Sequence, residues 1–194
     1  MSTIGIDKLH IAHLTKDDET GCTYSTPYSI PGLIEADIEP QTNSTTLYAD
    51  NIAYAVATGL GETKVTLNVE DLPQEVYSKL LGHTIESGVT VCNAEDQPLE
   101  VAVMFESKKR DGSIKYIKLL KGKFQEPSEN PKTATDTPDF VTPTIEGTFI
   151  ARKCDKVWKM TAESSNKAFT GAKTWYDEVG DVTIAKQSGG GGNG

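Results

Sequence analysis

The sequence predicts a mainly β domain with a short flanking α-helix, and three observations support this prediction. Apolar and polar residues alternate in most of the patterned segments, which places one set of side chains on each face of a strand. Helical patterns are confined to two short segments. Aromatic residues make up only 7% of the chain, so the core must consist chiefly of Val, Ile and Leu. The 194 residues suit one domain, expected over residues 1–187.

The clearest pattern lies within residues 28–57 and predicts a long hairpin. Over residues 34–39, apolar side chains alternate with carboxylates, so a strand here has one apolar face and one acidic face. A polar bend is expected over residues 40–46, followed by a returning strand. The carboxylates of this hairpin are Glu35, Asp37 and Glu39, with Asp50 beyond the expected bend.

Further strands follow from the same alternation. The segment 108–113 reads as a turn between two apolar strands, which makes 99–124 the clearest short hairpin. A second turn, over 153–155, joins the last two strands. The remaining strands are predicted at 4–14, 64–69, 99–106, 114–124, 144–152 and 156–162.

Two short helices complete the prediction. Asp71 is a suitable N-cap for a helix at about 72–81, with Pro73 in the first turn and Gly82 as its end. A second helix is expected over 171–179, with Trp175 and Val179 on its buried side. Mostly strands with few helices indicate a mainly β domain.

Two segments have loop composition. Residues 125–143 contain four prolines and few apolar residues, which predicts a long projecting loop. Residues 188–194 are rich in glycine and predict a flexible tail.

Charge is distributed unevenly along the chain. The net charge is −9, and residues 1–97 contain 15 acidic and 4 basic residues, against 13 and 15 in residues 98–194. Such polarity would allow head-to-tail association between copies. From charge alone, an uneven but solvated surface is the simpler interpretation. The main basic cluster includes Lys108, Lys109, Arg110, Lys115 and Lys118.

The cysteines and the hydropathy pattern indicate a cellular location. Cys22, Cys92 and Cys154 are an odd number at wide spacing, so free thiols in a reducing compartment are expected. No apolar run reaches the roughly 20 residues that span a bilayer, and no leader pattern opens the chain. These observations predict a protein of the cytosol, or one released by lysis.

A search for chemistry yields no catalytic, metal or cofactor site. His10 and His13 would point to opposite faces of a strand, so they are not expected to chelate one ion. Zinc-finger cysteine pairs, a nucleophile elbow and a phosphate loop are all missing from the sequence. The acidic balance also opposes nucleic-acid binding, which depends on phosphate neutralisation. No enzyme activity and no cofactor are therefore predicted.

Several strings, in their order and spacing, resemble the major tail protein, or tail tube subunit, of long-tailed, siphovirus-type bacteriophages. The resemblance covers about residues 4–180. The strings are I-G-I-D-K-L-H-I-A-H-L, I-P-G-L-I-E-A-D-I-E-P, T-T-L-Y-A-D-N-I-A-Y-A-V, D-L-P-Q-E-V-Y-S-K-L-L-G, A-V-M-F-E-S, Y-I-K-L-L-K-G-K-F and T-P-T-I-E-G-T-F-I-A-R.

The resemblance implies a β-sandwich with a flanking helix and projecting loops. It further implies hexameric rings that stack into a hollow tube, with an inner wall formed by a continuous, electronegative β-barrel. DNA would pass through without specific binding, and a tape-measure protein would fill the lumen during assembly. Other implied partners are the tail terminator and distal tail proteins. The resemblance also implies that the protein is located in the virion tail and that the tail is assembled in the cytoplasm of the host bacterium. No membrane partner is implied.

Assembly residues are assigned as hypotheses. Glu35, Asp37, Glu39 and Asp50 are expected on a lumen or a ring-to-ring surface, and both placements stay open. The basic cluster is expected to supply complementary charge at an inter-subunit contact. The projecting loop is expected to reach the next ring through Gln125, Glu126, Glu129, Lys132, Asp136 and Asp139.

Two alternatives remain at this point. One is another ring-forming component, such as a tail terminator or the tube protein of a contractile or secretion apparatus. The other, from a different class, is a carbohydrate-binding β-sandwich in which Trp158, Trp175 and Tyr28 would stack on sugars.

Overall fold

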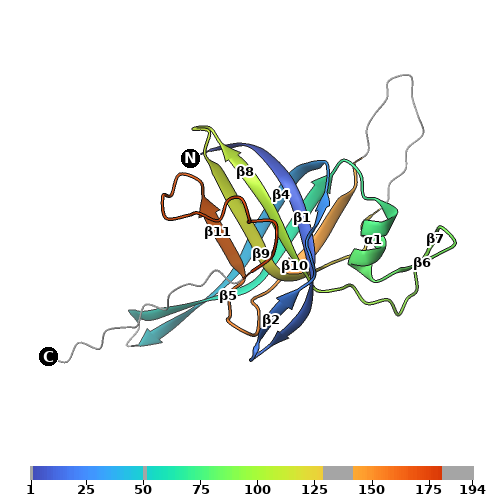
Figure 1. Cartoon of the computed structure of the whole chain (residues 1–194). Coiled ribbons are helices and arrows are strands. Elements are labelled where there is room, and N and C mark those ends of the chain that lie inside the picture. The colour runs from blue at the N-terminus through green and yellow to red at the C-terminus, as the bar shows by residue number, and fades with distance from the viewer. Residues whose placement is uncertain (1, 50–51, 129–141, 181–194) are drawn as a thin grey trace, which may run out of the picture.

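A computed structural model describes residues 2–49, 52–128 and 142–180, and its side chains outside residues 45–58. The ordered elements are strands with one short helix, as Figure 1 shows. Their bounds are β1 Thr3–Asp18, β2 Gly21–Tyr24, β3 Tyr28–Ile30, β4 Leu33–Ala49, β5 Ile52–Val69, α1 Gln74–Leu81, β6 Thr84–Glu86, β7 Val89–Val91, β8 Val101–Lys109, β9 Ile114–Phe124, β10 Thr144–Phe149 and β11 Lys159–Glu163.

One antiparallel sheet of nine strands contains nearly all of these strands, in the order β2-β1-β8-β9-β10-β5-β4. In addition, β3 pairs with β1 and β11 pairs with β9, while β6 and β7 form a separate small sheet. The sheet curls strongly, as Figure 1 shows. This curl brings β1 into contact with β4, although the two strands lie far apart in the strand order. The predicted mainly β class is therefore confirmed, and both layers around the core belong to one continuous sheet.

The main core lies inside this curl. Alternating aliphatic side chains of β1, β5 and β8 meet there, and α1 closes one end with Leu80 and Leu81. Phe124 and Phe149 pack edge to face, with ring centroids 5.8 Å apart. The fully buried side chains of this core include Leu9, Ile11, Ile30, Leu67, Leu119 and Ile145.

A second, smaller core lies on the outer face of β8 and β9. The predicted pattern of 99–106 places Ala102 and Met104 opposite the main core, and both are fully buried. They pack with Leu120 and with Val179 from the C-terminal segment. Residues 150–180 thus cover the outer face of these strands, which explains why β8 is buried on both sides.

The prediction of a helix over 171–179 is wrong, although the buried positions were predicted correctly. Residues 171–177 form consecutive turns, and Trp175 and Val179 are 5% and 1% exposed. The carbonyl oxygens of Glu178 and Val179 accept hydrogen bonds from the Lys118 ammonium, at 2.8 Å and 3.2 Å. Side-chain packing and these tertiary bonds fix the segment, so it needs no helical turn.

The predicted bend over 40–46 is also wrong. β4 continues through this region to Ala49, with an irregular register between Pro40 and Thr42. Pro40 lacks an N–H donor, but β4 is the last strand of the sheet order, and such an edge tolerates proline. The start of the predicted hairpin is separate as well, since Tyr28–Ile30 forms β3 and pairs with β1.

The first predicted helix is confirmed with a shifted start. Pro73 occupies the N-cap position of α1 and no side chain caps the helix, so the assignment of Asp71 as cap is wrong. Gly82 ends the helix in a left-handed conformation, with φ of 79°, and its N–H donates to the Ser78 carbonyl. The hairpin of β8 and β9 is confirmed, and the last strand, β11, pairs with β9.

Candidate assembly surface

The carboxylates Glu35, Asp37 and Glu39 lie on one exposed face of the curled sheet. They point outward because the intervening Ala36 and Ile38 pack against the core. In the register with β5, the three carboxylates stand opposite Asn68, Thr66 and Lys64 respectively.

Neighbouring strands extend this exposed face. β10 pairs with β5 so that Glu146 lies beside Thr66, and Thr148 beside Lys64. Glu146 and Lys64 form an exposed ion pair of 3.0 Å, and this hydrogen bond, with the charge of Glu146, raises the pKa of Lys64. We call this surface the acidic sheet face, and its exposed charged residues are Glu35, Asp37, Glu39, Glu62, Lys64 and Glu146.

Sequence reasoning missed Glu62 and Glu146. Each alternates with buried residues of its own strand, Glu62 with Thr63 and Val65, and Glu146 with Ile145. That local signal was available, but it does not reveal that β10 and β4 both flank β5. The pairing of β10 with β5 joins segments about 80 residues apart in the chain. Asp50, the fourth predicted carboxylate, lies outside the described residues.

The predicted basic cluster divides into exposed and buried side chains. Lys108 and Arg110 are exposed at the end of β8, and Lys115 is half-buried. Lys109 is 9% exposed and pairs with Glu163 at 2.5 Å. Only part of this cluster is therefore available for contact with another molecule.

Lys118 lies inside the subunit, at 5% exposure. Its ammonium lies 4.3 Å from the centre of the Trp175 ring, in cation–π geometry, and it donates to the two carbonyls described above. Burial lowers the pKa of Lys118 to about 8, against the opposing charge of Glu178. The assignment of Lys118 to a contact surface is thus corrected, because this residue anchors the C-terminal segment to β9.

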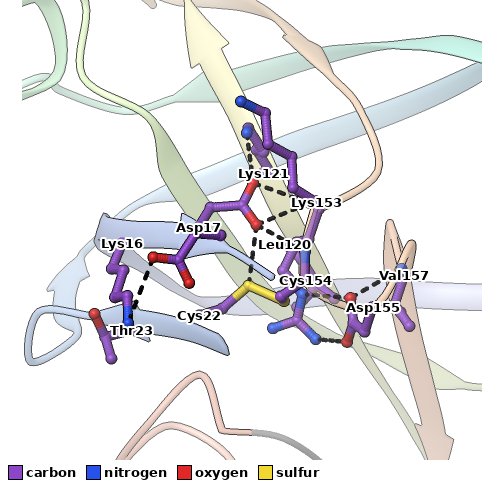
Figure 2. The surroundings of a disulfide bond; sticks show 12 residues. Lys16, Asp17, Cys22, Thr23, Leu120, Lys121, Lys153, Cys154, Asp155 and Val157 are labelled. Carbon is purple, nitrogen blue, oxygen red and sulfur yellow. Dashed lines mark hydrogen bonds and ion pairs between the residues drawn. A yellow bond between two sulfur atoms is a disulfide. The ribbon is translucent and has the colours of Figure 1, made fainter. Parts of the chain in front are cut away.

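A half-buried junction joins the β1–β2 hairpin to the C-terminal segment, as Figure 2 shows. Cys22 and Cys154 form a disulfide across 132 residues, with a Cα–Cα distance of 6.1 Å. The expectation of free thiols at these positions is therefore wrong, and only Cys92 is free. Spacing along the chain could not reveal this pair, since the fold alone brings the two segments together.

Asp17 organises the same junction. Its carboxylate forms an ion pair of 2.6 Å with Lys121 and accepts backbone hydrogen bonds from Lys153 and Cys154 (Figure 2). Burial would raise the pKa of Asp17, but these hydrogen bonds and the Lys121 charge outweigh it and lower the pKa. Asp17, Cys22 and Cys154 resemble a metal-ligand group, yet their sulfurs bond to each other and the carboxylate bonds to Lys121.

The base of the predicted projecting loop is fixed to the region of α1. The Gln125 N–H donates to the Glu146 carbonyl at 2.8 Å. Glu126 accepts from the Tyr77 hydroxyl and lies 3.2 Å from His83 Nε2, while His83 Nδ1 lies 2.7 Å from Asp96. The hydrogen bond to Asp96 contributes most to the raised pKa of His83. The other predicted loop residues, Glu129, Lys132, Asp136 and Asp139, lie outside the described residues.

The aromatic residues considered for sugar stacking are engaged in packing. Trp175 is 5% exposed and packs against Tyr116 and Phe169, which also contact each other. Tyr28 and Trp158 are half-buried against the main core. These side chains do not form the exposed platform that a carbohydrate-binding sandwich requires.

Comparison with known proteins identifies the family. The profile of the family described as phage tail tube protein matches residues 1–186, nearly the whole chain. Among curated proteins, none matches significantly. In the described part of the chain, no helix has the length and apolar content needed to cross a membrane. The match agrees with the mainly β fold, and the chain therefore belongs to the phage tail tube protein family, whose members are structural components of the virion tail.

Proposed function

We propose that this protein forms hexameric rings that stack into the tail tube, a non-enzymatic conduit through which DNA leaves the virion. The membership of the tail tube family supports self-assembly into a tube. The acidic sheet face is the observation that supports the more detailed proposal of a conduit for DNA. It places four exposed carboxylates of β4 and β10 on one continuous surface, with Lys64 as the cation paired to one of them.

The sign of this charge suits a wall along which DNA slides. Basic side chains would neutralise phosphates, release counterions and hold the DNA in place. Carboxylates repel phosphates, and this repulsion acts over about 8–10 Å at physiological ionic strength. We assign Glu35, Asp37 and Glu39 to the lumen in the first instance, and a ring-to-ring position is the alternative that the experiment below distinguishes.

The open edge of β4 supports assembly through the sheet itself. β4 is the last strand of the sheet order, so one side of its backbone has no partner strand among the described residues. Such an edge readily pairs with a strand of another chain. Pairing between copies would continue the sheet around the ring and form a closed inner barrel.

Contacts between rings involve other segments in this proposal. Exposed Lys108 and Arg110 offer positive charge to an acidic neighbour, and the segment 125–143 is proposed to reach the next ring from its anchor at Glu126. A tape-measure protein would occupy the lumen, and a tail terminator and distal tail proteins would bind the tube ends. Assembly is proposed to take place in the cytoplasm of the host bacterium.

Charge reversal tests the lumen assignment. Phage tails would be built with E35K, D37K and E39K combined, and compared with tails carrying E19K, E75K and D177K, a matched triple reversal of exposed acids elsewhere. If the acidic sheet face lines the lumen, the first variant forms tails of normal length that deliver DNA poorly, and the control delivers normally. If it lies between rings, tube growth itself fails. Tails of normal length with normal DNA delivery would refute both placements.

A further inference from the structure

A short hairpin projects beyond α1, at the right of Figure 1. Strands β6 and β7 pair along their whole length. Ser87 and Gly88, in the turn between them, have φ of 50° and 82°, as tight hairpin turns of this twist require. The Gln74 side chain ties this hairpin to α1 by donating to the Gly88 carbonyl and the Thr90 hydroxyl. We call residues 84–91 the hairpin arm.

One face of the hairpin arm has no partner in the described part of the chain. Thr90 points toward α1, so the residues that alternate with it lie on the opposite face. Val89 and Val91 on this free face are 61% and 44% exposed. An isolated two-stranded hairpin is marginally stable in water, and exposed apolar side chains grouped on it indicate a contact surface. The free face consists of Thr84, Glu86, Val89 and Val91.

A groove of about 660 Å³ lies between the beginnings of β1 and β4. Ile4 and Ile34 on its lining are 63% and 51% exposed, so the groove offers two large aliphatic side chains to a contacting surface. Phe105 and Ile117, both buried, extend the apolar lining inward. We call this the β1–β4 groove.

Two lysines, Lys115 and Lys159, also line the β1–β4 groove, and the Lys159 ammonium lies 5.4 Å from the centre of the Trp158 ring. Burial lowers the pKa of Lys159, and the positive charge of Lys115 lowers it further. Neither ammonium forms an ion pair with a carboxylate in the described residues. Glu35 is the acid in the lining, so the groove keeps a surplus of positive charge. A partner surface that fits the β1–β4 groove would therefore be apolar and would carry a carboxylate.

We propose that the hairpin arm of one copy docks in the β1–β4 groove of a neighbouring copy. Val89 and Val91 then cover Ile4 and Ile34, and Glu86 lies beside the two ammonium groups of the groove. The free face of the arm matches the groove in apolar character and in charge, because it combines exposed valines with a single carboxylate and no cation.

The contact joins two molecules because its two surfaces lie far apart in one subunit. The arm projects beyond α1, whereas the N-terminal end of β1, whose residues line the groove, lies on the opposite side of the molecule in Figure 1. Contacts between two different patches repeat head to tail and close into rings when the rotation permits. This proposal rests on the proposed function for the presence of neighbouring copies, and it adds which surfaces meet.

Cysteine cross-linking within assembled tails tests the contact. In a C92S background, which removes the free thiol, I34C and V89C are combined and the tails are oxidised with copper phenanthroline. We expect a ladder of covalent oligomers on non-reducing gels, because each chain links to two neighbours. Tails built from a mixture of I34C chains and V89C chains should stop at dimers. The pair I34C and D177C is the matched control and should remain monomeric.

Charge exchange gives a second readout. E86K and K159E should each raise the subunit concentration needed for assembly about tenfold, as expected for loss of an interface anchor, and the two combined should restore it. If the wild-type protein forms tails, but the I34C and V89C pair gives no ladder and the E86K variant assembles normally, the proposed contact is overturned and the proposed function is not. Wild-type chains that enter no tail tube would instead overturn the proposed function, so the two failures are distinguishable.

Discussion

Removal of the Cys22–Cys154 disulfide should strongly reduce the stability of the subunit. The perturbation is C22S combined with C154S, which leaves Cys92 as the remaining cysteine. The bond closes a loop of 132 residues. The chain-entropy relation for such a loop gives about 5 kcal/mol at 25 °C, and measured values typically fall at about 2–4 kcal/mol. We expect a loss in the range of about 2–5 kcal/mol.

Removal of the disulfide should not completely unfold the junction between the β1–β2 hairpin and the C-terminal segment. Asp17 continues to join Lys121 to the backbone of Lys153 and Cys154 without the disulfide, so the C-terminal segment keeps polar contacts to β1 and β9. Lys118 and Trp175 anchor the same segment farther along. The native fold should therefore persist with a lower free energy of unfolding.

Urea unfolding followed by far-UV circular dichroism measures this effect. For a protein with an m-value of about 2 kcal/mol/M, the expected loss moves the midpoint down by about 1–2.5 M. Wild-type protein treated with a reductant should match the double variant, and C92S should match the untreated wild type. An unchanged midpoint, or three titratable thiols in unfolded wild-type protein without reductant, would refute the reasoning.

Two further predictions concern buried charges. D17N should cost about 1.5–3 kcal/mol near pH 7, because it removes the 2.6 Å ion pair and leaves Lys121 with the longer contact to Glu100, at 3.5 Å. The lowered pKa of Asp17 stabilises the fold at pH values above the pKa that this carboxyl has in the unfolded chain, so the difference from wild type should shrink in acid. Lys118 has a pKa of about 8 in the fold, below its unfolded value, so stability should rise between about pH 8 and 10.5. Thermal unfolding scans against pH should show this rise in wild type and lose it in K118M.

The local patterns of the sequence predicted the strands well, because alternation reports directly which face of a strand is buried. Val65 and Leu67 are fully buried, while Glu35 and Asp37 are exposed, as their alternation indicates. Gly82 was predicted as a helix end for a local reason too, since it supplies the left-handed conformation. Predictions of this kind depend only on neighbours in sequence.

The features that were predicted wrongly depend on distant segments. Pro40 suggested a bend, but an edge position lets β4 continue through it. Lys118 belonged to a run of basic residues that suggested a surface, whereas Trp175, far along the chain, covers it. Cys22 and Cys154 gave no local sign of their bond.

The candidate surface was predicted in part. The carboxylates of β4 were recognised from their own alternation, but the contribution of Glu146 required the pairing of β10 with β5. The β1–β4 groove was not predicted, since it joins side chains of five strands that are remote from one another in sequence. The acidic sheet face and the β1–β4 groove are thus products of the curled sheet rather than of a motif.

Cryo-electron microscopy of tails containing this protein tests the central claim most directly. The account predicts stacked rings of six subunits, with β4 and β5 in the inner wall and Glu35, Asp37 and Glu39 facing the lumen. A tube whose inner wall is formed by other strands, with the acidic sheet face on the outer surface, would contradict the account, as would an assembly that stops at a single ring.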